Sequence, residues 1–323
     1  MDIEYARVAA HVLSRPWAVT PEMMATMADL LALRMQGGRL DRDEIAARIN
    51  AAKPQPVGKV RAGAAAVVPI HGVITHRADM FSEISGMTSL EKVRAQLDAA
   101  LQDKKVETVM LHIDSPGGSV DGVTETAAMV REARGKKRVV AVADTLAASA
   151  AYWIGSQADE FTITPSGEVG SIGVYTMHRD LSRRLGNDGV NVSLIHAGAH
   201  KVEGNPFEPL SSEARAAIQG DVDEVYDMFV ADVAAGRGVT LDTVLGTYGQ
   251  GRTLSAKRAL AAGMVDVVEP FAETLARYRG TAPAEDPPSA PIKIRRGQAA
   301  RTPNNRARLS AGLLLSSLPP ARG

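Results

Sequence analysis

The stretch Ala143-Asp144-Thr145-Leu146-Ala147-Ala148-Ser149-Ala150-Ala151-Tyr152-Trp153-Ile154 joins an apolar run to an alanine-rich helix. The run before it, Arg138-Val139-Val140-Ala141-Val142, predicts a buried strand. Ser149 stands at the predicted start of the helix, where backbone N–H groups lack partners and the helix dipole is positive. This position suits a group that carries negative charge transiently, so Ser149 is a candidate nucleophile. The alternative is a buried serine packed against the strand.

Strands and helices alternate on both sides of this stretch. Towards the N-terminus, apolar runs predict strands and helical spacing predicts helices, in the order strand 65–70, helix 89–101, strand 106–113 and helix 120–134. Towards the C-terminus we expect strands at 161–163, 172–175 and 190–195, a long helix with apolar residues from 214 to 233, and a helix, turn and strand within 254–268. Alternation of this kind is typical of βαβ units around a largely parallel sheet.

The composition excludes several classes of protein. Lys plus Arg number 37 and Asp plus Glu also number 37, so no global charge favours nucleic acid or a membrane surface. The absence of cysteine excludes disulfides and thiolate metal sites and fits a cytosolic protein. No stretch reaches the roughly 20 apolar residues of a membrane span, and the acidic start is unlike a secretion signal. We expect a cytoplasmic protein without a metal or cofactor.

The pattern divides the chain into three regions. Residues 1–60 predict a helical extension, in which Thr20-Pro21-Glu22 starts a helix. Residues 61–278 hold the alternating strands and helices and form the main domain. Residues 279–323 become rich in arginine and proline, which predicts a disordered basic tail. Leu313-Leu314-Leu315 in this tail is a candidate docking segment, and a solvated tail is the alternative.

A pair of glycines marks a second candidate site element. Gly117 and Gly118 follow the strand predicted at 106–113, at the edge where parallel sheets gather their sites. Glycine lets backbone N–H groups approach a substrate closely. The N–H groups of Gly118 and Ala150 are therefore candidates for an oxyanion hole, which stabilises the negative oxygen of an acyl-transfer intermediate. A simple tight turn is the alternative.

A serine nucleophile needs a base. Seven histidines are present, and none lies in a local pattern that pairs it with Ser149. Lysines serve as bases where burial lowers their pKa. Lys201 follows an apolar segment in a loop of small residues, which makes it a candidate, although a solvent-facing loop lysine is the alternative. Ser171, flanked by glycine on one side, either orients the lysine amine or caps a turn.

The order of the motifs resembles the signal peptide peptidase A (protease IV) family of serine peptidases over residues 65–270. The matching segments are Asp114-Ser115-Pro116-Gly117-Gly118, Ala148-Ser149-Ala150-Ala151-Tyr152, Ala158-Asp159-Glu160, Gly170-Ser171-Ile172-Gly173-Val174 and His200-Lys201 with Asn205-Pro206-Phe207. The resemblance implies an α/β fold of the ClpP/crotonase type, built from repeated ββα units.

The same resemblance implies a Ser-Lys dyad. Ser149 is then the nucleophile and Lys201 the general base, while Gly118 and Ala150 line the oxyanion hole. Ser171 and Gly117 support them. Where the family often has Gly-Gly after the serine, this chain has Ala150-Ala151, whose methyl groups narrow the cleft.

Residues 1–60, with Arg15-Pro16-Trp17-Ala18, resemble the phage-encoded branch of prohead or capsid-assembly proteases. This implies a homo-oligomer that cleaves capsid or scaffold precursors in the host cytoplasm or inside the procapsid, with the basic tail on capsid protein or nucleic acid. Three alternatives stay open. They are a cytoplasmic signal-peptide-peptidase-like protease that degrades peptides, a crotonase-type acyl-CoA enzyme, and a non-catalytic assembly protein.

Overall fold

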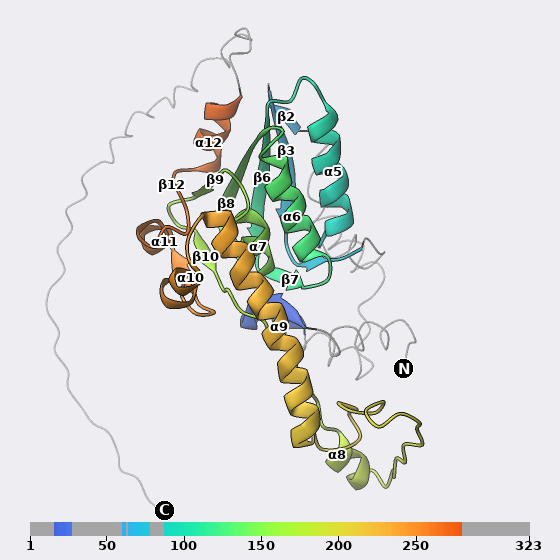
Figure 1. The fold of residues 1–323 in the computed structure, drawn as a ribbon. Helices are drawn as coiled ribbons and strands as arrows, with labels where there is room; N and C mark the ends of the chain where they lie inside the picture. Colours follow the sequence, from blue (N-terminus) through green and yellow to red (C-terminus); the bar gives the residue numbers. More distant parts are fainter. Residues whose placement is uncertain (1–15, 28–59, 63, 78–86, 280–323) are drawn as a thin grey trace, which may run out of the picture. The chain divides into compact units, whose positions relative to one another are not determined.

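The structure is a computed structural model that describes residues 16–27, 60–62, 64–77 and 87–279 (Figure 1). Its larger sheet has the spatial order β11 (Thr253–Ser255), β10 (Glu168–Gly170), β8 (Arg138–Ala148), β6 (Thr108–Ser115), β3 (Ala65–His71) and β2 (Val60–Ala62). β9 (Glu160–Ile163) also pairs with β8, and β12 (Val267–Val268) pairs with β9. β3, β6 and β8 are parallel, as their continuous apolar sequences predict.

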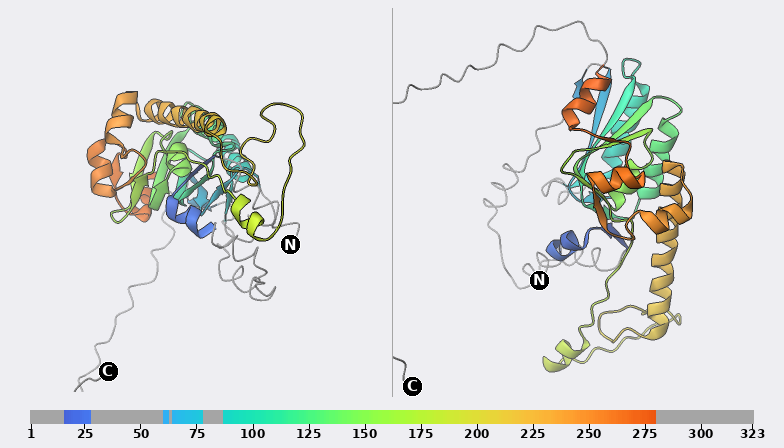
Figure 2. Two further views of the ribbon diagram at one scale, coloured as in Figure 1. Left: turned by 90° about the horizontal axis from the view of Figure 1, so that it is seen from below. Right: turned by 90° about the vertical axis from the view of Figure 1, so that its left-hand side faces the viewer.

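Helices cover both faces of this sheet. α5 (Leu90–Gln102) and α6 (Val123–Ala133) pack on one face, and α12 (Phe271–Tyr278) packs on the other (Figures 1 and 2). Side chains alternate between the two layers. Leu111 joins the core under α5 and α6, whereas its neighbour Met110 joins the cluster under α12. The predicted α/β class is confirmed, and the layers agree with the ClpP/crotonase expectation.

A smaller sheet forms where the central strands end. Its order is β1 (Trp17–Val19), β7 (Gly117–Ser119), β4 (Ile74–Thr75) and β5 (Thr88–Ser89). The prediction of helix throughout the N-terminal extension is wrong for β1. Its apolar residues pair with β7, and this tertiary contact overrides local propensity. Residues 21–27 are helical, as Thr20-Pro21-Glu22 predicts.

Two further strand predictions are wrong. Residues 190–195 form no strand, because their alternating apolar side chains find no sheet edge and Ile195 is fully exposed. Residues 172–175 also form none, since β10 ends at Gly170 and only Tyr175 makes an isolated bridge, to Trp17. Most of the predicted extension 1–60 and nearly all of the tail 279–323 lie outside the described residues, so both boundaries stay predictions.

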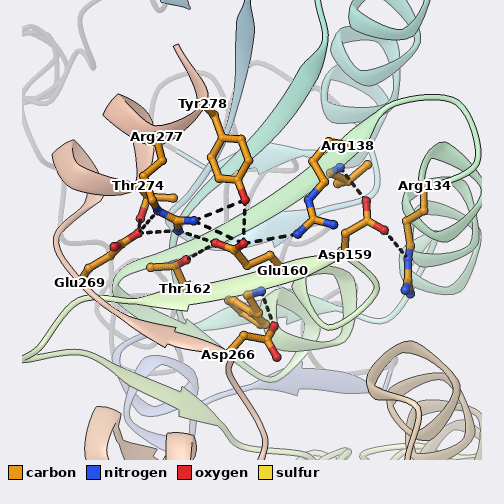
Figure 3. A network of polar contacts seen from close by, with 12 residues as sticks. Arg134, Arg138, Asp159, Glu160, Thr162, Asp266, Glu269, Thr274, Arg277 and Tyr278 are labelled. Atoms are coloured by element: carbon orange, nitrogen blue, oxygen red, sulfur yellow. Dashed lines mark hydrogen bonds and ion pairs between the residues drawn. The ribbon is translucent and has the colours of Figure 1, made fainter. Parts of the chain in front are cut away.

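The motif Ala158-Asp159-Glu160 has a structural role, shown in Figure 3. Asp159 accepts hydrogen bonds from Val139 N–H (2.8 Å) and from Arg134 of α6 (3.1 Å). Glu160 accepts from Arg277 and Tyr278 of α12, the latter at 2.6 Å. Burial alone would raise the pKa of Glu160, but these two hydrogen bonds outweigh it and the pKa is lowered. The motif therefore ties the helices of both faces to the sheet.

The remaining helices lie after β8. They are α7 (Ala150–Gly155), α8 (Ser182–Asn187), α9 (Ser212–Arg237), α10 (Leu241–Thr247) and α11 (Ala256–Ala262). The buried residues of α9 lie in its C-terminal part, from Phe229 onward, apart from Ala214, whereas its N-terminal part is mostly exposed. Figures 1 and 2 show α8 and this exposed half of α9 extending beyond the sheet. We call residues 176–228 the arm.

Candidate active site

Ser149 occupies a sharp turn between a strand and a helix. β8 ends at Ala148, α7 begins at Ala150, and Ser149 between them has φ 55° and ψ −120°. A non-glycine residue at such angles costs about 1–3 kcal/mol, and strain of this kind concentrates at functional sites. The Ser149 N–H donates to Gly170 O at 2.7 Å and its Oγ to Gly173 O at 3.4 Å. The backbone therefore presents this hydroxyl in one fixed direction.

Side chains of α7 fix this turn to the rest of the core. The Trp153 ring stacks on Phe229 of α9 with centroids 4.4 Å apart, and its Nε1 donates to Asp232 at 2.8 Å. The neighbouring Tyr152 hydroxyl donates to Met264 O at 2.9 Å. All six residues of α7 are buried. The apolar sequence after Ser149 is thus an anchor that holds the serine in place.

Gly118, predicted for the oxyanion hole, and Gly117, predicted to support the site, form the turn that packs against Ser149. Gly117 has φ 97°, and a Cβ there would lie 2.9 Å from the Ser149 Cβ. A Cβ on Gly118 would lie 1.9 Å from the Ile74 carbonyl oxygen, so no larger residue fits without moving the backbone. The Ser115 hydroxyl accepts from Gly117 N–H at 3.2 Å and stabilises the turn. Sequence reasoning did not predict this supporting role of Ser115.

The segment 170–173 forms the other wall. Gly170 pairs with Ala148 in the parallel ladder between β10 and β8. Ser171 follows with φ 54°, is almost fully buried, and donates its N–H to Arg252 O at 2.9 Å. Ser171 therefore lies between the two residues whose carbonyls accept hydrogen bonds from Ser149. Ala150 completes the group, because its N–H belongs to the first turn of α7, where helical partners are lacking.

Lys201 lies elsewhere in the described chain. It is an exposed residue of the arm, in the segment between α8 and α9, and its N–H donates to Gly198 O at 3.2 Å. Ser149 Oγ faces Gly173 O instead of this lysine. The structure of one chain thus brings together Ser149, Ala150, Ser171, Gly117 and Gly118, but not Lys201.

A groove opens beside the serine, of about 410 Å³. Four separate segments line it: Ile172-Gly173-Val174, the α9 residues Gln219, Val222, Asp223 and Tyr226, Leu245 of α10, and Gln250-Gly251. Sequence reasoning missed this groove because it depends on how α9 crosses the end of the sheet. Gly173 lines the groove, and its carbonyl oxygen accepts the hydrogen bond of the buried Ser149 hydroxyl, so the groove ends one residue away from the serine.

Two polar clusters lie outside this site. On the α12 side of the sheet, a hydrogen bond of 3.2 Å joins the ring nitrogens His112 Nδ1 and His71 Nε2. The other ring nitrogen of His112 lies 2.8 Å from an Asp144 carboxylate oxygen, and the His112 ring stacks on Phe271. On the arm, the exposed His200, Glu203 and Glu213 bring ligand atoms within 4.8 Å of one another and could together hold a cation. The hydrogen bond that His200 Nδ1 donates to the Glu203 carboxylate, at 2.5 Å, raises the pKa of His200. In the described part of the chain, no helix is both long and apolar enough to cross a bilayer.

Comparisons with known proteins bear on the identity of the chain. The model of "Peptidase family S49" matches residues 131–283. The chain is 36% identical over 201 residues to the head-tail preconnector protein GP5 of Enterobacteria phage P21, with 62% of this chain and 40% of that protein covered. It is 33% identical over 201 residues to capsid assembly protease C of Escherichia phage lambda, with 62% and 45% covered.

A third relative is covered over more of its length. The candidate protease slr0021 of Synechocystis sp. is 30% identical over 186 residues, with 57% of this chain and 67% of that protein covered. The chain spans less than half the length of the two phage relatives. The family model covers Ser149, Ser171 and Lys201, which the motif order had singled out. Together, these matches show that the chain belongs to peptidase family S49.

Proposed function

We propose that the chain is a serine endopeptidase with Ser149 as nucleophile and Lys201 as general base. The backbone of Ser149 carries this proposal. A strained residue at a strand-to-helix turn, beside two glycines that tolerate no side chain, is the arrangement expected of a serine that attacks a carbonyl. No such strain is needed for a serine that only packs against a strand.

In the proposed reaction, the Lys201 amine takes the proton from Ser149 as its Oγ attacks the peptide carbonyl carbon. The N–H groups of Gly118 and Ala150 donate to the oxygen, which becomes negative. The lysine then gives its proton to the leaving amine, and an acyl-enzyme remains. Water, deprotonated by the same lysine, hydrolyses the ester and restores the Ser149 hydroxyl.

We propose that a second copy of the chain supplies the base, because Lys201 and Ser149 are not brought together within one chain. Lys201 is exposed on the arm, whereas Ser149 is buried in the core. The arm also exposes apolar side chains, with Ile195 100% and Val190 47% accessible. Surfaces of this kind favour association, and symmetric assembly repeats each contact around the oligomer. Docking of the arm against a neighbour would also remove water from the lysine, which favours its neutral form.

The substrate proposal rests on the named relatives. Capsid assembly protease C of phage lambda and the P21 preconnector protein each align with 201 residues of this chain. We therefore propose phage capsid or scaffold precursors as substrates, met in the host cytoplasm or in the assembling head. The basic tail, which lies outside the described residues, stays a candidate contact for capsid protein.

A labelling experiment tests the nucleophile. A fluorophosphonate probe should attach to wild-type protein at Ser149, identified by mass spectrometry of the modified peptide. Ser149→Ala should lose labelling and the cleavage of a co-expressed capsid or scaffold precursor. Lys201→Ala should lose cleavage while keeping the same melting temperature, because the residue is exposed. Full precursor cleavage by either variant would refute the assignment.

A further inference from the structure

The N-terminal strand β1 lies in a slot between the two walls of the site. On one side it pairs antiparallel with β7, with Ala18 opposite Gly118. On the other side Trp17 exchanges both backbone hydrogen bonds with Tyr175, at 2.9 and 3.1 Å. The backbone of β1 thus forms hydrogen bonds with both edges of the slot, β7 on one side and Tyr175 on the other. An extended peptide added to a sheet edge makes the same type of contact.

The slot is next to the proposed nucleophile. A Cβ placed on Gly117 would lie 2.2 Å from the Ala18 carbonyl oxygen and 2.9 Å from the Ser149 Cβ. The Ala18 oxygen and the Ser149 Cβ are therefore no farther apart than the sum of these two distances, which places β1 next to the serine. Thr20 N–H donates to Pro116 O at 3.0 Å. In an antiparallel ladder, hydrogen-bonded pairs alternate with pairs that are not hydrogen-bonded. Since Thr20 bonds to Pro116, the next hydrogen-bonded pair two residues along is Ala18 with Gly118. The Gly118 N–H, the proposed oxyanion donor, therefore points at Ala18.

β1 also accounts for the burial of the site. Ser149 has no exposed surface and Ser171 is 6% exposed, although a peptidase serine must meet its substrate. The side chains of β1 divide between two surroundings. Trp17 and Val19 pack into a cluster with Met24 and Val73, whereas the small Ala18 packs into the main core. The slot thus holds two apolar side chains on one face and a small residue between them.

We propose that β1 fills the peptide-binding slot of this enzyme, and that a substrate strand must displace it. The slot then takes an extended peptide, antiparallel to β7, with apolar side chains two residues apart and a small residue between. This proposal rests on the proposed peptidase function for the identity of the substrate. It makes the N-terminal strand an internal inhibitor of Ser149.

The test weakens β1 without altering the site. The double variant Trp17→Ser with Val19→Ser removes the apolar contacts of the strand, and Ala18→Pro removes the N–H that pairs with β7. Leu97→Ala in α5, buried in the main core but outside the cluster that holds Trp17 and Val19, is a control for general loosening. Circular dichroism melting shows which variants are folded, and the proline variant serves if the double variant does not fold.

Two measurements are made on the folded proteins. The first is binding of a fluorescent peptide with the sequence of residues 14–22, measured by polarisation in the Ser149→Ala background, with a scrambled peptide for comparison. The second is the rate of fluorophosphonate labelling with Ser149 present. Weakening β1 should raise both affinity for the matching peptide and labelling rate at least about tenfold, because the open slot becomes more populated. Leu97→Ala should change neither.

The outcomes separate the two proposals. Equal peptide binding and equal labelling in wild type and a folded β1 variant would overturn the inhibitory role and leave the peptidase intact. Tighter peptide binding without labelling of any variant would overturn the nucleophile and leave the slot. Binding of the scrambled peptide as tightly as the matching one would overturn the stated side-chain preference.

Discussion

At the scale of single residues, the site depends on positions where a side chain cannot fit. A Cβ added to Gly118 would clash with the Ile74 carbonyl, and one added to Gly117 would clash with Ala18 of β1 and with Ser149. The same geometry that places the backbone of Gly117 next to Ser149 leaves no room for a Cβ. These glycines are therefore required by packing as well as by the proposed chemistry.

Gly118→Ala should destabilise the fold by about 2 kcal/mol or more, because its Cβ would overlap a backbone oxygen and force the backbone to shift. It should also reduce the rate of substrate cleavage by about 10²-fold or more, since the oxyanion donor moves. Gly220→Ala is the matched control. Gly220 is helical with no atom near its added Cβ, so the change should stabilise α9 by up to about 1 kcal/mol. Equal stability of the two variants in urea unfolding would contradict the packing argument.

His71 should make stability depend on pH. Burial, followed by the charge of His112, lowers the pKa of His71 below 6.5, although Asp114 and Asp144 act in the opposite direction. The unfolded chain then binds this proton more readily than the folded one, so stability is lost as pH falls below 6.5. His71→Gln should therefore show a shallower loss of melting temperature between neutral pH and pH 5 than wild type. An unaltered slope in His71→Gln would rule out this explanation.

At the scale of elements, the buried half of α9 holds α7 and thereby Ser149. Asp232 accepts from Trp153 at 2.8 Å and from Arg131 of α6 at 3.0 Å. One carboxylate thus joins three helices behind the serine. Because Trp153 is fully buried, loss of this carboxylate leaves the indole N–H without its hydrogen-bond partner.

Asp232→Ala should cost about 1–3 kcal/mol of unfolding free energy, because the buried donor of Trp153 loses its partner. Asp223→Ala on the exposed half of the same helix is the control, since the Asp223 carboxylate accepts a hydrogen bond from the exposed Gln219 at 2.7 Å. It should change stability by less than about 0.5 kcal/mol. Chemical denaturation of both variants measures the difference, and equal losses would show that Asp232 does not hold α7.

The sequence predicts some elements well and others poorly, for identifiable reasons. The long strands β3, β6 and β8 have continuous apolar runs, and Ser149 meets Gly117 because the carboxyl ends of parallel strands lie together. The family predicted from the motif order is confirmed. β1 was not predicted because its three residues form a strand only by pairing with β7, which is distant in the sequence. The roles of Ser149 and Lys201 stay predictions, since no local pattern determines what the arm contacts.

At the scale of the whole molecule, one chain holds the nucleophile and carries its proposed base on the arm. Ile195 is the most exposed large apolar residue of this arm. Ile195→Asp should weaken self-association and reduce cleavage together, because a buried charge opposes the arm contact. Sedimentation velocity measures the first effect and precursor cleavage the second. Reduced cleavage with unchanged assembly would mean that the arm acts in some other way.

Mixing two inactive variants tests the shared site most directly. Ser149→Ala subunits keep Lys201, and Lys201→Ala subunits keep Ser149, so a site formed between two copies is complete wherever one of each meets. If the subunits mix at random in a symmetric oligomer, cleavage should return to about one quarter of the wild-type rate. Complete inactivity of the verified mixed oligomer, beside an active wild type treated in the same way, would contradict a dyad shared between copies.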